Sequence, residues 1–243
     1  MAPPWLTERP YAHRGLHGPQ SGIPENCIAG FEAAIEGGYG IELDVQETSD
    51  GEPVVFHDYK LDRLTGETGP VAARKLGDLQ MILLKDSKQH IASLEEVLSV
   101  VAGRTPILIE VKTRKLRPGQ FEAAVARIVA DYAGPAAIMS FNIHSMIWFN
   151  KEASATTRGL VATRWRYGGR DLPWSVEWLP LAYNAKRCGV AFVAYDFRLI
   201  PTPETQDLRK KGTPVLTWTV KRSKDRDKAT QFADGMIFEG WKP

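Results

Sequence analysis

The sequence has 243 residues, of which 43% are hydrophobic and 25% are charged. This composition is typical of a globular protein, and the length fits one large α/β domain or two small ones. A net charge of +2 argues against a nucleic-acid partner, and no segment reaches the roughly 20 apolar residues that cross a bilayer.

Two cysteines, Cys27 and Cys188, are the candidates for a disulfide. So few cysteines in a chain of this size indicate free thiols in a reducing compartment, although an oxidised pair stays open at this point. The first ten residues lack the apolar run of a signal peptide. We therefore expect a cytoplasmic protein without stable membrane insertion. The sequence leaves the oligomeric state open.

The chain begins with a predicted short strand that ends at His13 and is followed by Arg14. Glycines and a proline over residues 16–23 predict a loop. Residues 24–26 are expected to open a helix, because apolar residues then recur at helical spacing until a glycine pair at 37–38.

Residues 40–58 predict two strands with a turn at 49–51 between them. Glu42 and Asp44 lie two residues apart on the first strand, so they point to the same face. Two carboxylates buried on one face repel each other and require a proton or a metal ion between them. The strands either pair as a hairpin or are joined by a short excursion into a neighbouring strand. Both arrangements bring His57 near the carboxylates.

The rest of the chain alternates helices and strands after a polar, irregular segment over residues 60–90. A capping box at Ser93 opens a helix. Residues 106–112 form an apolar run typical of a parallel strand covered on both faces, and Glu110 and Lys112 share a face at its end. Further strands are expected over 136–141, 157–162, 190–196, 214–220 and 234–239, a loop over 163–170, and helices near 121–129, from 144, over 179–187, over 202–211 and before the last strand.

About eight strands that mostly alternate with helices predict an α/β fold, a single (β/α)8 TIM barrel over residues 1–243 with a short irregular segment after the third strand. A doubly wound open sheet is the main alternative, but no Gly-x-Gly-x-x-Gly motif follows a predicted strand. In a barrel the carboxyl ends of the strands converge on one mouth, where active sites lie.

Polar side chains near the predicted strand ends would meet at that mouth: His13, Arg14, Glu42, Asp44, His57, Glu110, Lys112 and Trp218. Three carboxylates suit an oxygen-preferring cation such as Ca²⁺ or Mg²⁺ better than zinc. Two histidines beside that cation can act as acid and base near neutral pH. The arginine and the lysine add positive charge. Together, these groups predict a site that binds an anionic substrate and catalyses phosphoryl transfer.

Nine short motifs in this order resemble those of the glycerophosphodiester phosphodiesterases: His13-Arg-Gly, Pro24-Glu-Asn26, Glu42-x-Asp44-Val, Asp50-Gly, His57-Asp58, Ser93-Leu-Glu-Glu, Glu110-x-Lys112, Ser140-Phe141 and Trp218-Thr-Val. The resemblance runs from about residue 11 to residue 238. Each motif alone is a weak signal, whereas all of them in order at sensible spacing are a strong one.

The resemblance implies a TIM barrel of the phosphoinositide-phospholipase-C-like type. It also implies metal-dependent hydrolysis of small-molecule glycerophosphodiesters to glycerol 3-phosphate and an alcohol, within lipid and glycerol metabolism. One divalent metal, Ca²⁺ or Mg²⁺, would be bound by Glu42, Asp44 and Glu110, and His13 and His57 would be the acid–base pair. The glycerol 2-hydroxyl would attack phosphorus to give a cyclic phosphate, which water then opens. Contacts to the phosphate or the substrate are implied for Arg14, Lys112, Glu25, Asn26 and Trp218.

The sequence departs from the family pattern in two places: Lys221 stands where asparagine is usual, and the usual ending Asp-Gly-Ile-Ile-Thr-Asp reads Asp234-Gly-Met-Ile-Phe-Glu239. Neither is expected to touch the metal ligands, so these departures concern substrate contacts more than activity. Lysophospholipase D or sphingomyelinase D activity is the enzymatic alternative, and it would require apolar surface at the mouth for an acyl chain. A barrel that binds phosphate without turnover is the alternative from another class, and the presence of every expected histidine and carboxylate argues against it.

Overall fold

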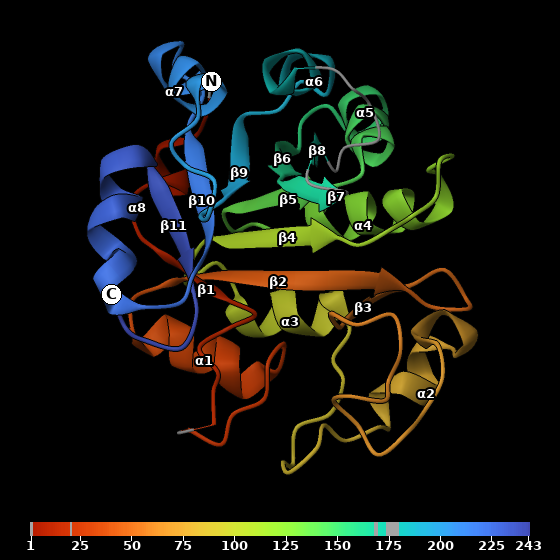
Figure 1. Cartoon of the computed structure of the whole chain (residues 1–243). Helices are drawn as coiled ribbons and strands as arrows, with labels where there is room; N and C mark the ends of the chain where they lie inside the picture. Colours follow the sequence, from red (N-terminus) through yellow and green to blue (C-terminus); the bar gives the residue numbers. More distant parts are fainter. Residues whose placement is uncertain (1, 20, 168–169, 174–179) are drawn as a thin grey trace.

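The computed structural model of the protein describes residues 2–19, 21–167, 170–173 and 180–243. Eight parallel strands close into a barrel, because β1 pairs with β2 on one side and with β11 on the other (Figure 1). The barrel strands are β1 (Tyr11–His13), β2 (Gly40–Glu47), β4 (Ile107–Val111), β5 (Ala136–Ser140), β6 (Thr157–Ala162), β9 (Phe192–Asp196), β10 (Val215–Val220) and β11 (Gly235–Phe238). The predicted TIM barrel is confirmed, and the open doubly wound sheet is not the fold.

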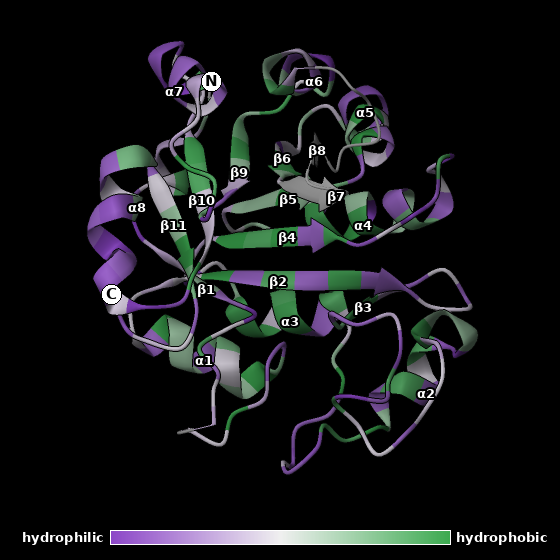
Figure 2. Cartoon of the chain, viewed as in Figure 1, coloured by the Kyte–Doolittle hydropathy of each residue, from purple (hydrophilic) through white to green (hydrophobic). Residues whose placement is uncertain are grey.

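Alternate residues of a barrel strand face the interior or the surrounding helices. On β4, Leu108 belongs to the interior cluster, whereas Ile107 and Ile109 pack in the larger core beneath the helices. Both layers are buried, which explains the continuous apolar run of this strand. Figure 2 shows β4 as hydrophobic along most of its length and hydrophilic near its carboxyl end. Glu110, two residues beyond Leu108, therefore points into the barrel at its functional end.

Helices alternate with the strands and surround the barrel (Figure 1). They are α1 (Ile28–Glu36), α3 (Leu94–Val101), α4 (Gln120–Ala130), α5 (Ile143–Glu152), α6 (Leu181–Arg187), α7 (Pro203–Lys210) and α8 (Arg226–Phe232). The hydroxyl of Ser93 accepts from the backbone N–H of Glu96, as the capping box predicts. The helix expected to open at residues 24–26 begins at Ile28 instead. Asn26 has a φ of 54°, which an α-helix does not allow.

The strand β2 extends into an antiparallel hairpin with β3 (Pro53–Val55), in which Val45 lies opposite Val55. The hairpin alternative is thus correct, and the third strand of the chain lies outside the barrel. The segment after it contains η2 (Val71–Ala73) and α2 (Leu76–Gln80). This segment, the excursion after β3, packs against Cys27 and Val54 in a small core that also contains Phe56, Leu61, Val71, Leu79, Leu84 and Ile91.

The segment after β6 differs from its prediction. A loop was expected over residues 163–170, but β7 (Arg164–Tyr167) pairs antiparallel with β8 (Arg170–Pro173). The helix expected from residue 179 is α6, which begins at Leu181, and residue 179 lies outside the described residues. Short 3₁₀ helices occur as η1 (Pro4–Leu6) and η3 (Ser223–Asp225).

Both cysteines are buried free thiols, as the sequence predicts. Burial raises the pKa of the Cys27 thiol, which keeps it in its less reactive protonated form. In the described part of the chain, none of the helices has the length and the apolar character needed to span a bilayer.

Candidate active site

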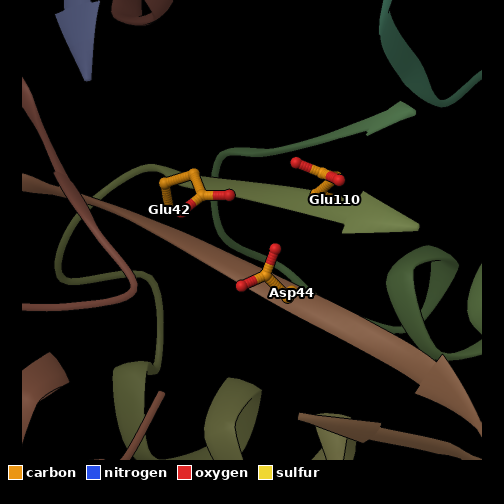
Figure 3. Close-up of side chains that lie close together, drawn as sticks. All are labelled: Glu42, Asp44 and Glu110. Carbon is orange, nitrogen blue, oxygen red and sulfur yellow. The ribbon is translucent and has the colours of Figure 1, made fainter. Parts of the chain in front are cut away.

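Three buried carboxylates lie together inside the carboxyl end of the barrel. Glu42 and Asp44 come from β2 and Glu110 comes from the neighbouring strand β4, where it is the register partner of Asp44. Their side chains point toward one another (Figure 3), and one oxygen from each lies within 4.8 Å of the others. The alternation that sends Leu43 and Val45 toward the helices sends these acids inward. The three predicted metal ligands are thus brought together.

The three carboxylates do not share their negative charge evenly. Burial, together with Asp44 and Glu110, raises the pKa of Glu42 well above its usual range. The pKa of Asp44 is lowered, because Lys112 and Arg14 outweigh the opposing effect of burial. The neighbouring cations therefore balance the negative charge of Asp44 but not that of Glu42. An all-oxygen donor set with this deficit fits a hard divalent cation such as Ca²⁺ or Mg²⁺.

Lys112 lies against two of the candidate ligands. Its Nζ is 2.6 Å from Oε1 of Glu110 and 3.1 Å from Oδ1 of Asp44. Burial opposes the charged form, but the two carboxylates dominate and raise the pKa of Lys112. The lysine is therefore a largely buried cation held against two of the three clustered carboxylates.

Arg14 joins the carboxylate cluster to a second acid, Glu25. Its backbone N–H donates to Oε2 of Glu42 at 3.0 Å, and its Nη1 donates to Oε1 of Glu25 at 2.8 Å. Its Nε lies 3.3 Å from Oδ2 of Asp44. The residue adopts a φ of 57°, which turns the chain after β1 so that backbone and side chain both face the site.

Asn26 lies behind Asp44 and fixes its orientation. Its amide nitrogen donates to Oδ2 of Asp44 at 2.9 Å, and its Oδ1 accepts from the Asp44 backbone N–H at 3.3 Å. Asn26 is 1% exposed. It can therefore orient Asp44, a candidate metal ligand, whereas the resemblance groups Asn26 with the substrate contacts.

The first histidine, His13, lies at the end of β1. Its Nδ1 is 2.6 Å from Oε2 of Glu239, and its Nε2 is 3.9 Å from Oε2 of Glu42. The other oxygen of Glu239 accepts from Nζ of Lys221 at 2.9 Å. One ring nitrogen is thus occupied by a carboxylate, and the other faces the cluster.

The second histidine, His57, follows β3 in the excursion. Its Nδ1 is 2.6 Å from Oδ1 of Asp58, and Nε of Arg63 donates to Oδ2 of Asp58 at 2.7 Å. Arg63 also donates to Glu25 through both terminal nitrogens, at 2.9 and 2.8 Å. Burial lowers the pKa of His57, which favours its neutral form.

A cavity of about 650 Å³ opens beside these groups. Its lining includes the polar side chains of His57, Glu110 and Lys112 and the aromatic side chains of Phe141 and Trp218. The indole N–H of Trp218 donates to the Ala194 carbonyl at 3.0 Å, and the ring packs edge-on against Phe141. This predicted strand-end residue therefore lines a cavity large enough for a small organic substrate.

Sequence reasoning missed the two carboxylates that contact the histidines, Asp58 and Glu239, and also Arg63, which contacts Asp58. Asp58 adjoins His57 and was part of a recognised motif, so its contact could have been predicted from sequence adjacency. Arg63 lies in a polar segment that offers no periodic signal. Glu239 was noted as a departure, but only closure of the barrel brings it to His13.

The sequence matches the model of the glycerophosphoryl diester phosphodiesterase family over residues 13–238. A glycerophosphodiester phosphodiesterase of Caldanaerobacter subterraneus subsp. tengcongensis is 31% identical over 237 residues, which cover 93% of this chain and 91% of that protein. Among solved structures, a phosphodiesterase of Oleispira antarctica in complex with the product sn-glycerol-3-phosphate superposes with a TM-score of 0.79 at 20% identity. The match covers 96% of this chain and 93% of that one. A glycerophosphodiester phosphodiesterase of Thermotoga maritima gives a TM-score of 0.74 at 23% identity, with 94% and 92% covered.

Proposed function

Because the chain belongs to the glycerophosphoryl diester phosphodiesterase family and is a glycerophosphodiester phosphodiesterase, we propose that its hydrolysis is metal-dependent and uses His13 and His57 as the acid–base pair. The products are glycerol 3-phosphate and an alcohol. Glu42, Asp44 and Glu110 would hold one divalent cation, Ca²⁺ or Mg²⁺. When bound, this cation supplies positive charge to the phosphate oxygens that gain negative charge during the reaction.

The side chains of the protein bind the substrate and move its protons. Arg14 and Lys112 face the phosphate with positive charge. One histidine takes the proton of the glycerol 2-hydroxyl as its oxygen bonds to phosphorus, and the other protonates the alcohol oxygen as its bond to phosphorus breaks. The resulting cyclic phosphate is opened by water with the two proton transfers reversed, which releases glycerol 3-phosphate.

The observation that carries this proposal is that the two histidines near the three buried carboxylates have the same kind of partner. Each imidazole contacts a carboxylate through Nδ1, at 2.6 Å in both cases. This leaves Nε2 of each ring to exchange a proton with a substrate, following the logic of base and orienting acid found in catalytic triads.

Metal removal and ligand substitution test the proposal. Chelator-treated protein should release no glycerol 3-phosphate from glycerophosphocholine until Ca²⁺ or Mg²⁺ is added back. Glu42→Gln and Glu110→Gln should each lower kcat by at least about 100-fold, because they remove a ligand oxygen charge. Glu36→Gln, a substitution on α1 away from the site, is the matched control and should retain full activity. Full activity without metal, or in either site variant, would contradict the metal assignment.

A second candidate activity is the lysophospholipase D or sphingomyelinase D type. The aromatic side chains of Tyr59, Phe141 and Trp218 line the cavity and provide apolar surface for an acyl chain. Measuring kcat/KM for lysophosphatidylcholine against glycerophosphocholine decides between the two activities. A higher value for the lysophospholipid would favour the second.

We also propose that residues 1–243 act as one catalytic domain in a reducing compartment such as the cytoplasm. The barrel includes strands from residue 11 to residue 238, and its two thiols are free. The compartment can be tested on protein taken from its native cells. The protein is unfolded under non-reducing conditions, and free thiols at Cys27 and Cys188 are then labelled.

A further inference from the structure

We propose that Glu239 and Lys221 form a positioning pair that holds the His13 ring with Nε2 directed at the reacting phosphate. This inference rests on the proposed acid–base role of His13. It assigns a task to two of the residues at which the sequence departs from the family pattern. In the structure these two residues contact each other, at 2.9 Å between Nζ of Lys221 and Oε1 of Glu239.

The pair is assembled by the strands that close the barrel. β1 and β11 run parallel with Ala12 opposite Phe238, so the next residues, His13 and Glu239, emerge at the same end. β10 pairs with β11 on the other side, and the backbone N–H of Glu239 donates to the Val220 carbonyl at 3.1 Å. Lys221 follows Val220 directly. Three adjacent strand ends therefore place the three side chains in one row.

Within this row, each oxygen of the Glu239 carboxylate has a separate partner. Oε2 contacts Nδ1 of His13 at 2.6 Å, and Oε1 accepts from Lys221. The Glu239 side chain is 21% exposed, whereas that of Lys221 is 62% exposed. Two partners at opposite oxygens fix the carboxylate plane, and a fixed carboxylate fixes the ring that it contacts.

The consequence for the chemistry is a defined ring orientation. With Nδ1 held by Glu239, Nε2 is the nitrogen that faces Glu42, at 3.9 Å from its Oε2. An imidazole without this contact can rotate and can carry its proton on either nitrogen. Only a fraction of such molecules would present Nε2 in the reactive state. The loss should appear in kcat, since proton transfer belongs to the transition state, and leave KM nearly unchanged.

A stabilising role alone would give a different result. An ion pair that merely held β11 against β1 would change the free energy of unfolding and the fraction of folded protein, but not kcat per folded molecule. Kinetics of folded protein, with the folded fraction measured by circular dichroism, therefore separates positioning from simple stabilisation.

The first experiment measures kcat and KM for glycerophosphocholine with Glu239→Gln. We expect kcat to fall at least about 10–100-fold, the range found when the carboxylate partner of a metal-bound histidine is removed, with KM within about twofold. Glu239→Asp keeps the charge at a shorter reach and should recover part of the loss. Glu96→Gln is the matched control, because Glu96 contacts a histidine outside the site, at 2.9 Å from Nε2 of His90. It should leave kcat unchanged.

Lys221→Met tests the outer member of the pair. It removes a charge that contacts one oxygen of Glu239, so we expect a smaller loss of kcat, about twofold to tenfold. Lys211→Met is the control, because Lys211 forms a comparably exposed ion pair with Asp207 away from the site. Equal kinetics for the two lysine variants would remove Lys221 from the proposal.

A double-mutant cycle provides the decisive comparison. In a His13→Ala background Glu239→Gln should have less than a twofold effect, because the ring that it positions is absent. In a His57→Ala background the full loss should remain. Wild-type kcat in Glu239→Gln, or an undiminished loss in the His13→Ala background, would overturn the inference. Wild-type kcat in His13→Ala would instead overturn the proposed acid–base role itself.

Discussion

The two histidines face the same carboxylate cluster, but their supports are built in different ways. His57 is held by its sequence neighbour Asp58, and Arg63 lies five residues further on in the same excursion. His13 is held by Glu239, 226 residues away, across the seam at which the barrel closes. The His57 side chain is 30% exposed and that of His13 is 12% exposed.

This difference separates a local support from a global one. The Asp58 contact needs only a short segment in the correct conformation, whereas the Glu239 contact requires the first and the last barrel strand to meet. We therefore expect disturbances of the excursion to affect His57 selectively. Disturbances of barrel closure should affect His13.

The largest expected effects come from removing the rings themselves. His13→Ala and His57→Ala should each lower kcat by about 100- to 10,000-fold, the range typical of a lost general acid or base. Calorimetric titration with Ca²⁺ or Mg²⁺ should show that both variants retain cation affinity, because neither ring is a proposed ligand. If one variant kept near wild-type kcat, that histidine would not be needed for proton transfer, and the acid–base role would belong to the other histidine alone.

A smaller effect is expected from the local support. Asp58→Asn should lower kcat about tenfold, because the amide keeps the shape but loses the charge that holds Nδ1 of His57. Arg63→Gln should cost less, since it acts through Asp58 and Glu25. Steady-state kinetics would measure both changes, with Arg74→Gln as the control, because Arg74 pairs with Glu67 elsewhere in the excursion. An unchanged kcat in Asp58→Asn would mean that the loop backbone alone orients His57.

The smallest expected effect concerns stability and pH on the His13 side. The pKa of Glu239 is lowered, since its contacts with His13 and Lys221 outweigh the opposing effect of burial. The stabilisation is thus fully present above the unfolded-state pKa of 4.5 and is lost as pH falls toward the folded-state value. Glu239→Gln should lower the free energy of unfolding by about 1 kcal/mol at pH 7 and by less at pH 3. Urea unfolding at both pH values measures this, and an equal difference at both would contradict the assignment.

The barrel could be predicted from the sequence because its strands carry buried apolar runs that alternate with helices. The acids Glu42, Asp44 and Glu110 could be placed at its mouth because strand periodicity fixes the face on which each one lies. The hairpin of β2 and β3 stayed one of two alternatives, since a short turn alone does not decide which strands pair.

The remaining features depend on tertiary contacts that no local pattern encodes. Asn26 follows a proline and a glutamate that look like a helix start, but its backbone adopts a φ of 54° outside the helix. β7 and β8 pair as a two-stranded ribbon, but their sequences, Arg-Trp-Arg-Tyr and Arg-Asp-Leu-Pro, are too short to predict that pairing. The Glu239 contact cannot be predicted until the order of strands around the barrel is known.

The separation of His13 and Glu239 along the chain also determines when the contact can form during synthesis. During synthesis at about 5–20 residues per second, the 226 residues that separate them take at least about ten seconds to add. Once Glu110 has been added, the nascent polypeptide carries both histidines and all three acids, but its first histidine cannot be oriented until Glu239 follows. The enzyme therefore cannot reach its full turnover rate on the ribosome before its last strand has been made.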